Sequence, residues 1–212
     1  MDAVITDMLG LMSLPPGDAE LVQIVDTALA DAARRAGSWL ACKPGCTQCC
    51  HGAFSINALD AVRLHTGMQA LQSSDPDTAQ AIEQRAHEWI AEHGAGFPGD
   101  TKTGILGTSD EDQLRFDDFA NDAACPALNP ATGLCDIYAW RPMTCRVFGP
   151  PSRPNGSEAL ACCELCFVGA TEAEIAACAM PLPEALENEL LAHLDDSTET
   201  VVAFALLRAA TT

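Results

Sequence analysis

The spacing of the cysteines is the feature that most restricts how this chain can fold. The stretch CKPGCTQCCHG, residues 42–52, places four cysteines in nine positions. Short C-x2-C and C-x3-C loops let two or three sulfurs converge on one point, because the turn folds back within a few residues. The cysteine-bearing segments are also rich in Pro, Gly, Asn and Ser. We therefore expect irregular loops lined with thiols, held together by a scaffold formed elsewhere in the chain.

Ten of the eleven cysteines fall into three groups. The first group has the spacing C-x3-C-x2-C-C, the second has three cysteines at intervals of ten residues, and the third is CCELC. Thiols that only pack in a core need no such grouping, so we predict that these ten are metal ligands. They are Cys42, Cys46, Cys49, Cys50, Cys125, Cys135, Cys145, Cys162, Cys163 and Cys166.

Two features of the cysteine pattern need separate interpretations. Adjacent cysteines seldom serve one ion well, because neighbouring side chains tend to diverge. We therefore expect Cys49 and Cys50 to face different ligand sets or a single polynuclear cluster. Cys178 stands apart from the three groups in a helical stretch, and we expect it to pack as a small hydrophobe.

The length and the apolar runs of the chain predict the cellular compartment of the protein. A chain of 212 residues can bury a core that needs no covalent staples. The first residues lack the basic region of a secretory signal. The longest later apolar run, VVAFALL, is far shorter than the ~20 residues that span a bilayer. We predict a cytosolic protein, in which thiols stay reduced and a cysteine cluster indicates metal binding rather than disulfides.

The charge balance narrows the choice of partners. A formal net charge of -19 at pH 7 argues against nucleic acid and against an anionic membrane as partners. Clustered thiolates need compensating cations, and several of the few basic residues lie beside the cysteines. Arg141 and Arg146 flank Cys145 in RPMTCR, so we predict that they bind the cofactor by donating to sulfur or to a neighbouring carboxylate. The alternative is an ordinary surface ion pair.

Helical patterns lie outside the cysteine-bearing segments. Apolar residues at positions 21, 24, 25, 28, 29 and 32 recur at helical spacing after Asp18, a candidate N-cap. Asn57 and the pair Asp75–Pro76 are predicted to begin two further helices. Thr171 and Glu174 form a predicted capping box.

The sequence predicts a mainly α fold, a small helical scaffold with irregular cysteine-lined loops and little β structure. Only CDIY, residues 135–138, resembles a short strand. We predict a single domain over residues 1–212, with a cysteine-cluster metal-binding core at 42–166 and C-terminal helices at 171–210.

The joint pattern of the motifs resembles a known family. The N-terminal C-x3-C-x2-C-C, the later CPAL and GLCDIYAWRPMTCR, and a final Cys-Cys pair are similar to the YkgJ-type cysteine-cluster family of zinc- or iron-chelating domains. The resemblance runs from Cys42 to Cys166. It implies a cytosolic bacterial metal-binding or iron–sulfur protein, and some members of the family are described as lysine methylases. By position it implies ligand roles for the grouped cysteines, with Cys166 as an extra candidate.

Three functions remain open at this point. An iron–sulfur protein is favoured, with a [4Fe–4S] cluster, because Cys125–Pro126 resembles the Cys-Pro end of ferredoxin motifs. Structural zinc is the first alternative, since four thiolates, or three with His51, complete a tetrahedral site. An iron–sulfur-dependent methyl transfer enzyme is the second, which the lysine methylases of the resembling family imply. The first three cysteines also have the C-x3-C-x2-C spacing of radical S-adenosylmethionine enzymes, but βα alternation is missing, Gln48 stands where an aromatic residue is usual, and Cys50 is extra. We expect an iron–sulfur cluster or zinc as cofactor, a role in electron transfer or metal handling, and a redox or metal-delivery protein as partner.

Overall fold

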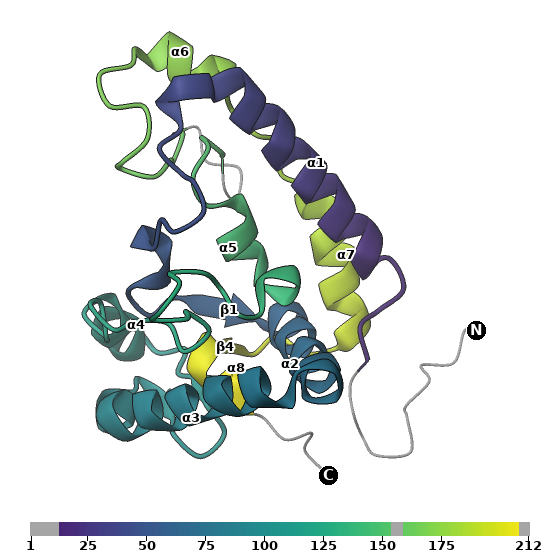
Figure 1. Cartoon of the computed structure of the whole chain (residues 1–212). Helices are drawn as coiled ribbons and strands as arrows, with labels where there is room; N and C mark the ends of the chain where they lie inside the picture. Colours follow the sequence, from purple (N-terminus) through teal and green to yellow (C-terminus); the bar gives the residue numbers. More distant parts are fainter. Residues whose placement is uncertain (1–12, 154–158, 208–212) are drawn as a thin grey trace. The chain divides into compact units, whose positions relative to one another are not determined.

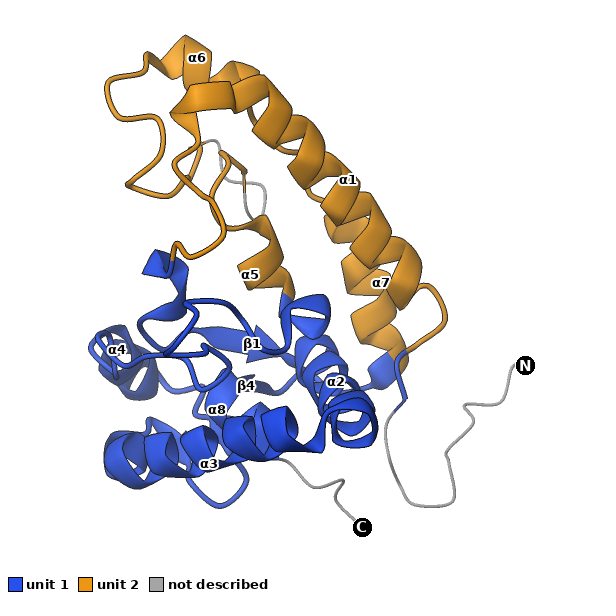
Figure 2. Ribbon diagram, viewed as in Figure 1, with its two compact units in different colours: residues 1–14, 47–142, 194–212 blue, residues 15–46, 143–193 orange. Residues whose placement is uncertain are grey.

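The structure, a computed structural model, describes residues 13–153 and 159–207, which are mainly helical, as the sequence predicts (Figure 1). These residues divide into two compact units (Figure 2). Unit 1 comprises residues 13–14, 47–142 and 194–207, and unit 2 comprises residues 15–46, 143–153 and 159–193. Each unit is thus assembled from segments that are distant in the sequence. That the whole chain behaves as one domain stays a prediction.

Three mutually packed helices form the scaffold of unit 1: α2 (Ala58–Ser74), α3 (Pro76–His93) and α8 (Val202–Leu207). The first two begin where the sequence predicts, because the side chains of Asn57 and Asp75 accept hydrogen bonds from N–H groups of the first turn. Pro76 lies in the first turn of α3, where its missing N–H leaves no hydrogen bond unmade. Residues 208–210, which the sequence assigns to the C-terminal helices, lie outside the described residues.

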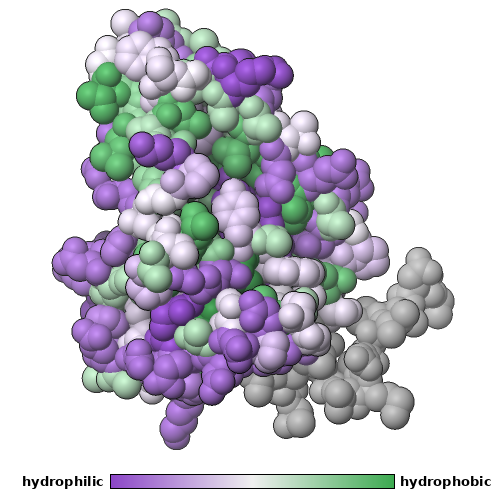
Figure 3. All heavy atoms as spheres, in the orientation of Figure 1, coloured by the Kyte–Doolittle hydropathy of each residue, from purple (hydrophilic) through white to green (hydrophobic). Residues whose placement is uncertain are grey.

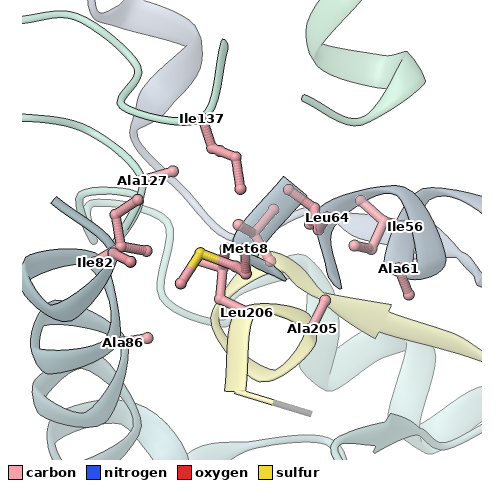
Figure 4. Close-up of a cluster of buried hydrophobic side chains, with 12 residues drawn as sticks. Ile56, Ala61, Leu64, Met68, Ile82, Ala86, Ala127, Ile137, Ala205 and Leu206 are labelled. Carbon is pink, nitrogen blue, oxygen red and sulfur yellow. The ribbon is translucent and has the colours of Figure 1, made fainter. Parts of the chain in front are cut away.

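The core of unit 1 lies between these helices and includes two side chains from the cysteine-bearing loops (Figure 4). Ala127 and Ile137, each two residues after a cysteine, are buried in the cluster formed by α2, α3 and α8. Cys125 and Cys135 are partly buried and pack against the same cluster. The helical scaffold therefore anchors both loops right beside their thiols.

Unit 1 also contains two short antiparallel ladders and several short helices. β1 (Ser55–Asn57) pairs with β4 (Glu199–Val201), and Ile56 lies opposite Thr200. β2 (Gly99–Asp100) pairs with β3 (Ile105–Leu106). The remaining helices of this unit are short: η2 (Gln48–Cys50), η3 (Gly94–Gly96), α4 (Asp110–Asp117) and η4 (Tyr138–Trp140).

The strand predicted at residues 135–138 is wrong. Cys135 forms only an isolated bridge with Leu128, and η4 begins three residues later. Two backbone hydrogen bonds close the loop before this segment. The Asn129 N–H donates to the Leu134 carbonyl at 2.8 Å, and the Asp136 N–H donates to the Ala127 carbonyl at 2.9 Å. These two bonds form the bridge between Leu128 and Cys135, and the pairing ends there because the chain turns into η4.

The described residues of unit 2 form four α-helices: α1 (Asp18–Ala36), α5 (Met143–Val147), α6 (Glu172–Ala177) and α7 (Glu184–Leu194). The last residue of α7 belongs to unit 1. A 3-10 turn, η1 (Gly37–Trp39), follows α1. The predicted capping box of Thr171 and Glu174 begins α6. The N-cap of α1 is Gly17, however, and Asp18 is the first helical residue. None of the helices in the described ranges is long and apolar enough to cross a membrane.

The face of α1 that packs is narrower than the sequence predicts. Leu21, Val25 and Ala32 are fully buried, as expected from their spacing. Ile24, which the same pattern places on the core face, is 40% exposed. Arg146 of α5 is buried and donates hydrogen bonds to both carboxylate oxygens of Asp26 on α1, at 2.9 and 3.0 Å. This ion pair joins the two helices within unit 2.

Replacing Gly67 with alanine is expected to destabilise unit 1. A side-chain carbon at Gly67 of α2 would lie 2.4 Å from the Trp140 ring, and η4 carries this tryptophan next to Arg141. Overpacking of this kind costs about 1–3 kcal/mol, whereas the better helix propensity of alanine returns at most about 1 kcal/mol. Urea denaturation should show a decrease in the free energy of unfolding of up to about 2 kcal/mol. An equal or higher value would show that Trp140 does not pack closely on α2.

Candidate metal centre

Backbone contacts bring together the thiols of unit 1, which we call the unit 1 thiol group: Cys49, Cys50, Cys125 and Cys135. The first two end the short helix η2. The Cys125 N–H donates a 2.7 Å hydrogen bond to the Cys50 carbonyl, so the two segments run beside each other. The bridge between Leu128 and Cys135 then links the third segment to the second. All four residues carry free thiols.

Backbone N–H groups point at two sulfurs of the unit 1 thiol group. The Cys125 sulfur accepts hydrogen bonds from the N–H groups of Ala127 and Leu128, and the Cys135 sulfur accepts one from the N–H of Ile137. Such bonds favour the thiolate, which is the form that binds metals. Since Ala127 and Ile137 are buried in the core, the scaffold itself holds these donors in place.

Three of these thiols, those of Cys49, Cys125 and Cys135, nevertheless have raised pKa values, which favour the protonated form. The Cys49 thiol donates a hydrogen bond to the Cys50 sulfur, and this bond, together with burial, raises the pKa of Cys49 well above its ordinary value. Burial raises the pKa of Cys125 to about 12 and also raises the pKa of Cys135. A metal ion among the sulfurs would lower these pKa values, because its positive charge stabilises thiolates directly.

Two arginines place positive charge beside the unit 1 thiol group. Arg141, a predicted cofactor-binding residue, opposes the rise in pKa at Cys49 and Cys135. Its guanidinium carbon lies 3.9 Å from the centre of the exposed Tyr138 ring. Its buried Nε has no hydrogen-bond partner among the described residues. A buried donor without an acceptor is rare in folded proteins, so this one is poised for an acceptor such as a metal-bound thiolate.

The second arginine, Arg85 of α3, is one that sequence reasoning missed. It donates a 2.7 Å hydrogen bond to the Pro126 carbonyl and a 2.8 Å one to Asp136. Its charge favours the thiolate of Cys125. Arg85 precedes Cys125 by 40 positions within a helix, so no motif in the sequence connects the two.

Unit 2 contains its own set of neighbouring thiols, which we call the unit 2 thiol group: Cys46, Cys162, Cys163 and Cys166. The Cys163 thiol donates a hydrogen bond to the Cys166 sulfur, and both residues are buried. Burial raises the pKa of Cys163, and the neighbouring Cys166 and Cys46 contribute to the rise. Burial and the neighbouring Cys166 also raise the pKa of Cys162.

The other predicted site residues also lie in unit 2. Cys42 is exposed, and Cys145 lies half-buried on α5. Arg146 donates to Asp26, as described above. Cys178 packs as a small hydrophobe, as predicted, but the prediction that it stands apart from the other thiols is wrong. It is the C-cap of α6 and is buried in an apolar cluster with Cys163 and Cys166.

The two thiol groups are organised as pairs. Within residues 13–153 and 159–207, no three His, Cys, Asp or Glu side chains are arranged to hold one metal ion. The sulfurs meet two at a time, Cys49 with Cys50 and Cys163 with Cys166. Binding a metal with three or four thiolates therefore requires side chains around each pair to rotate toward it.

Comparison with known proteins decides the family. Residues 41–167 match the family model CxxCxxCC, described as "Putative zinc- or iron-chelating domain". The chain belongs to the CxxCxxCC family. The matched range contains all ten grouped cysteines and excludes Cys178. Membership supports metal binding, with zinc or iron as the metal. No curated protein and no solved structure matches the chain.

Metal binding by this CxxCxxCC protein is expected to tighten as the pH rises. The thiols of Cys49, Cys125 and Cys135 have raised pKa values, so they are protonated at pH 7 and a metal must displace their protons. The apparent affinity should increase about 10-fold per pH unit for each proton released. Competition with a chelator at pH 6, 7 and 8, corrected for the chelator's own titration, measures this slope. An affinity independent of pH would show that thiols are not the ligands.

Proposed function

We propose that the protein is a cytoplasmic iron–sulfur protein in which the unit 1 thiol group holds a [4Fe–4S] cluster. The observation that carries the proposal is that four free thiols, three backbone N–H donors to sulfur and two arginines lie on neighbouring segments of one unit. Thiolates supply the ligands of such clusters, while hydrogen bonds to sulfur and nearby charges set the reduction potential. The unit thus contains both the ligands and the groups that would tune them.

The vicinal pair favours a cluster over a single ion. Cys49 and Cys50 are adjacent and their sulfurs are hydrogen-bonded to each other. Adjacent thiolates rarely bind one tetrahedral ion well, whereas a polynuclear cluster offers several metal atoms to neighbouring sulfurs. The Cys125–Pro126 sequence agrees with ferredoxin-type ligation.

Structural zinc is the second candidate function. Cys125 and Cys135 pack against the core of unit 1, as thiolates in a closed structural zinc site do. Four thiolates satisfy zinc as well as they satisfy iron. Methyl transfer by an iron–sulfur enzyme stays a prediction from the sequence.

The expected role is electron transfer or metal handling, with a redox or metal-delivery protein as partner. Leu134 and Tyr138 flank Cys135 and are 47% and 58% exposed. Figure 3 shows apolar side chains, in green, among the hydrophilic ones on one face of the molecule. Exposed apolar side chains beside a redox centre are suited to a transient protein contact.

Metal analysis of anaerobically purified protein tests the proposal. We expect iron and acid-labile sulfide in equal amounts, with a broad absorption near ~400 nm that bleaches on reduction. A colourless protein that contains zinc would make the second candidate correct. Protein free of bound metal after anaerobic purification and after reconstitution with iron and sulfide would overturn both.

A further inference from the structure

We infer that unit 2 carries a second, independent metal centre for one thiophilic divalent ion of the zinc type, a tetrathiolate site that Cys42 and Cys46 complete by rotating toward the pair Cys163 and Cys166. This inference extends the proposed metal-binding function and rests on it only in that the protein takes up metal. The unit 1 thiol group uses none of these four residues. The inference therefore assigns cysteines that the proposed cluster leaves without a role.

The chelating turn around Cys163 is the first observation. Its backbone folds back on itself, because the Cys166 N–H donates a 2.9 Å hydrogen bond to the Cys163 carbonyl. The Leu165 N–H donates to the Cys163 sulfur inside the same turn. A C-x2-C turn with an N–H aimed at the first sulfur places both sulfurs on one side, where they can share an ion. The hydrogen bond between the two thiols shows that they already face each other.

The second chelating loop lies beside the first. Cys46 interacts electrostatically with Cys163, so these two residues are neighbours. The Cys46 N–H donates a 2.9 Å hydrogen bond to the Lys43 carbonyl, which closes the turn of the C-x3-C loop. Two short neighbouring loops, each with two thiols, are the ligand pattern of structural zinc sites.

Gly149 lies beside both Cys42 and the backbone of Cys163. The Cys163 N–H donates a 3.2 Å hydrogen bond to the Gly149 carbonyl. A side-chain carbon at Gly149 would lie 3.7 Å from the Cys42 Cβ and 3.8 Å from its sulfur. Its backbone has a φ of +125°, which L side chains rarely adopt, so this conformation favours glycine. Cys42 thus lies next to the segment that hydrogen-bonds to Cys163.

The surroundings favour a closed site for a single ion. Cys163 and Cys166 are 6% and 4% exposed and lie among Ala36, Phe167 and Cys178. An apolar wall on one side keeps water from the buried pair, and the exposed Cys42 leaves the other side open for entry of the ion. Zinc and cobalt(II) prefer the same tetrahedral thiolate geometry, so cobalt(II) is the coloured probe for this site.

Cobalt(II) titration of a full-length variant tests the inference. Cys125→Ser with Cys135→Ser disables the unit 1 thiol group, and the metal-free, reduced variant is then titrated. We expect one equivalent of cobalt(II) with the intense visible absorption of a tetrahedral thiolate complex, and displacement by zinc. Cys42→Ser in that background should weaken cobalt(II) binding by about 10-fold or more. Cys178→Ala, the matched control for a buried thiol, should leave the spectrum unchanged.

The outcomes separate this inference from the proposed function. If the disabled variant stays folded by circular dichroism and binds no cobalt(II), the inference is wrong, while iron in the wild type still supports the proposed function. If Cys163→Ser with Cys166→Ser removes the metal of the unit 1 thiol group as well, the centres are not independent and the inference is also wrong. A wild type without a cluster whose disabled variant still binds one cobalt(II) would overturn the proposed function alone.

Discussion

Cys135→Ser is expected to remove the metal from unit 1 and to lower the melting temperature by roughly 10 °C. Serine keeps the size of the side chain but offers no thiolate, so the centre loses one of its four ligands. A metal present at about 1,000 times its dissociation constant contributes about 4 kcal/mol to stability. For a chain of this length, each kcal/mol shifts the melting temperature by about 2–4 °C. Calorimetry and metal analysis on the same sample measure both effects.

The matched controls distinguish ligand loss from a packing defect. Cys178→Ala also removes a buried thiol, but from the apolar cluster of unit 2, and should keep the full metal content of unit 1. Once both are treated with the chelator, the wild type and Cys135→Ser should melt within a few degrees of each other, because neither then holds a metal. If Cys135→Ser keeps its metal, Cys135 is not a ligand and the composition of the unit 1 thiol group is wrong.

Arg141→Gln is expected to lower the reduction potential of a unit 1 cluster by roughly 50–100 mV, the Coulomb effect of one nearby unit charge. Loss of positive charge beside Cys49 and Cys135 disfavours the reduced, more negative cluster. For a zinc centre, the same change should instead speed release to a chelator about 10-fold or more. Voltammetry and chelator competition measure the two effects.

Two further variants make this prediction specific. Arg141→Lys keeps the charge, so its potential should lie near that of the wild type. Arg115→Gln removes an arginine of unit 1 that contacts Asp112 and the Gly96 carbonyl, and it should change nothing. A potential and a release rate that are the same in Arg141→Gln and in the wild type would show that this guanidinium does not act on the metal.

Local signals made part of the fold predictable. The starts of α2, α3 and α6 were predicted correctly, because each depends on a capping side chain within a few residues of the turn that it caps. The helix α4 was missed, since it has no buried residue and therefore no apolar periodicity to mark it. The helix α5 has only five residues, too few for a periodic pattern to show.

Long-range contacts limit how much of the candidate site can be predicted from the sequence. The grouping of thiols in the sequence indicated metal binding, and the family match supports that prediction. The boundary between the two units falls between Cys46 and Thr47, so the four cysteines of the first motif belong to different units. The spacing of the motif does not indicate this boundary. The role of Arg85 and the burial of Cys178 beside Cys163 both arise from contacts that only the folded chain creates.

X-ray absorption at the edge of the bound metal tests the central claim, that cysteine sulfurs hold the metal, most directly. The protein should be measured as purified without oxygen, with its metal content determined on the same sample. We expect a first shell of about four sulfur atoms at about 2.3 Å, with an additional metal–metal shell if iron forms a cluster. A first shell made mainly of nitrogen and oxygen would contradict the account.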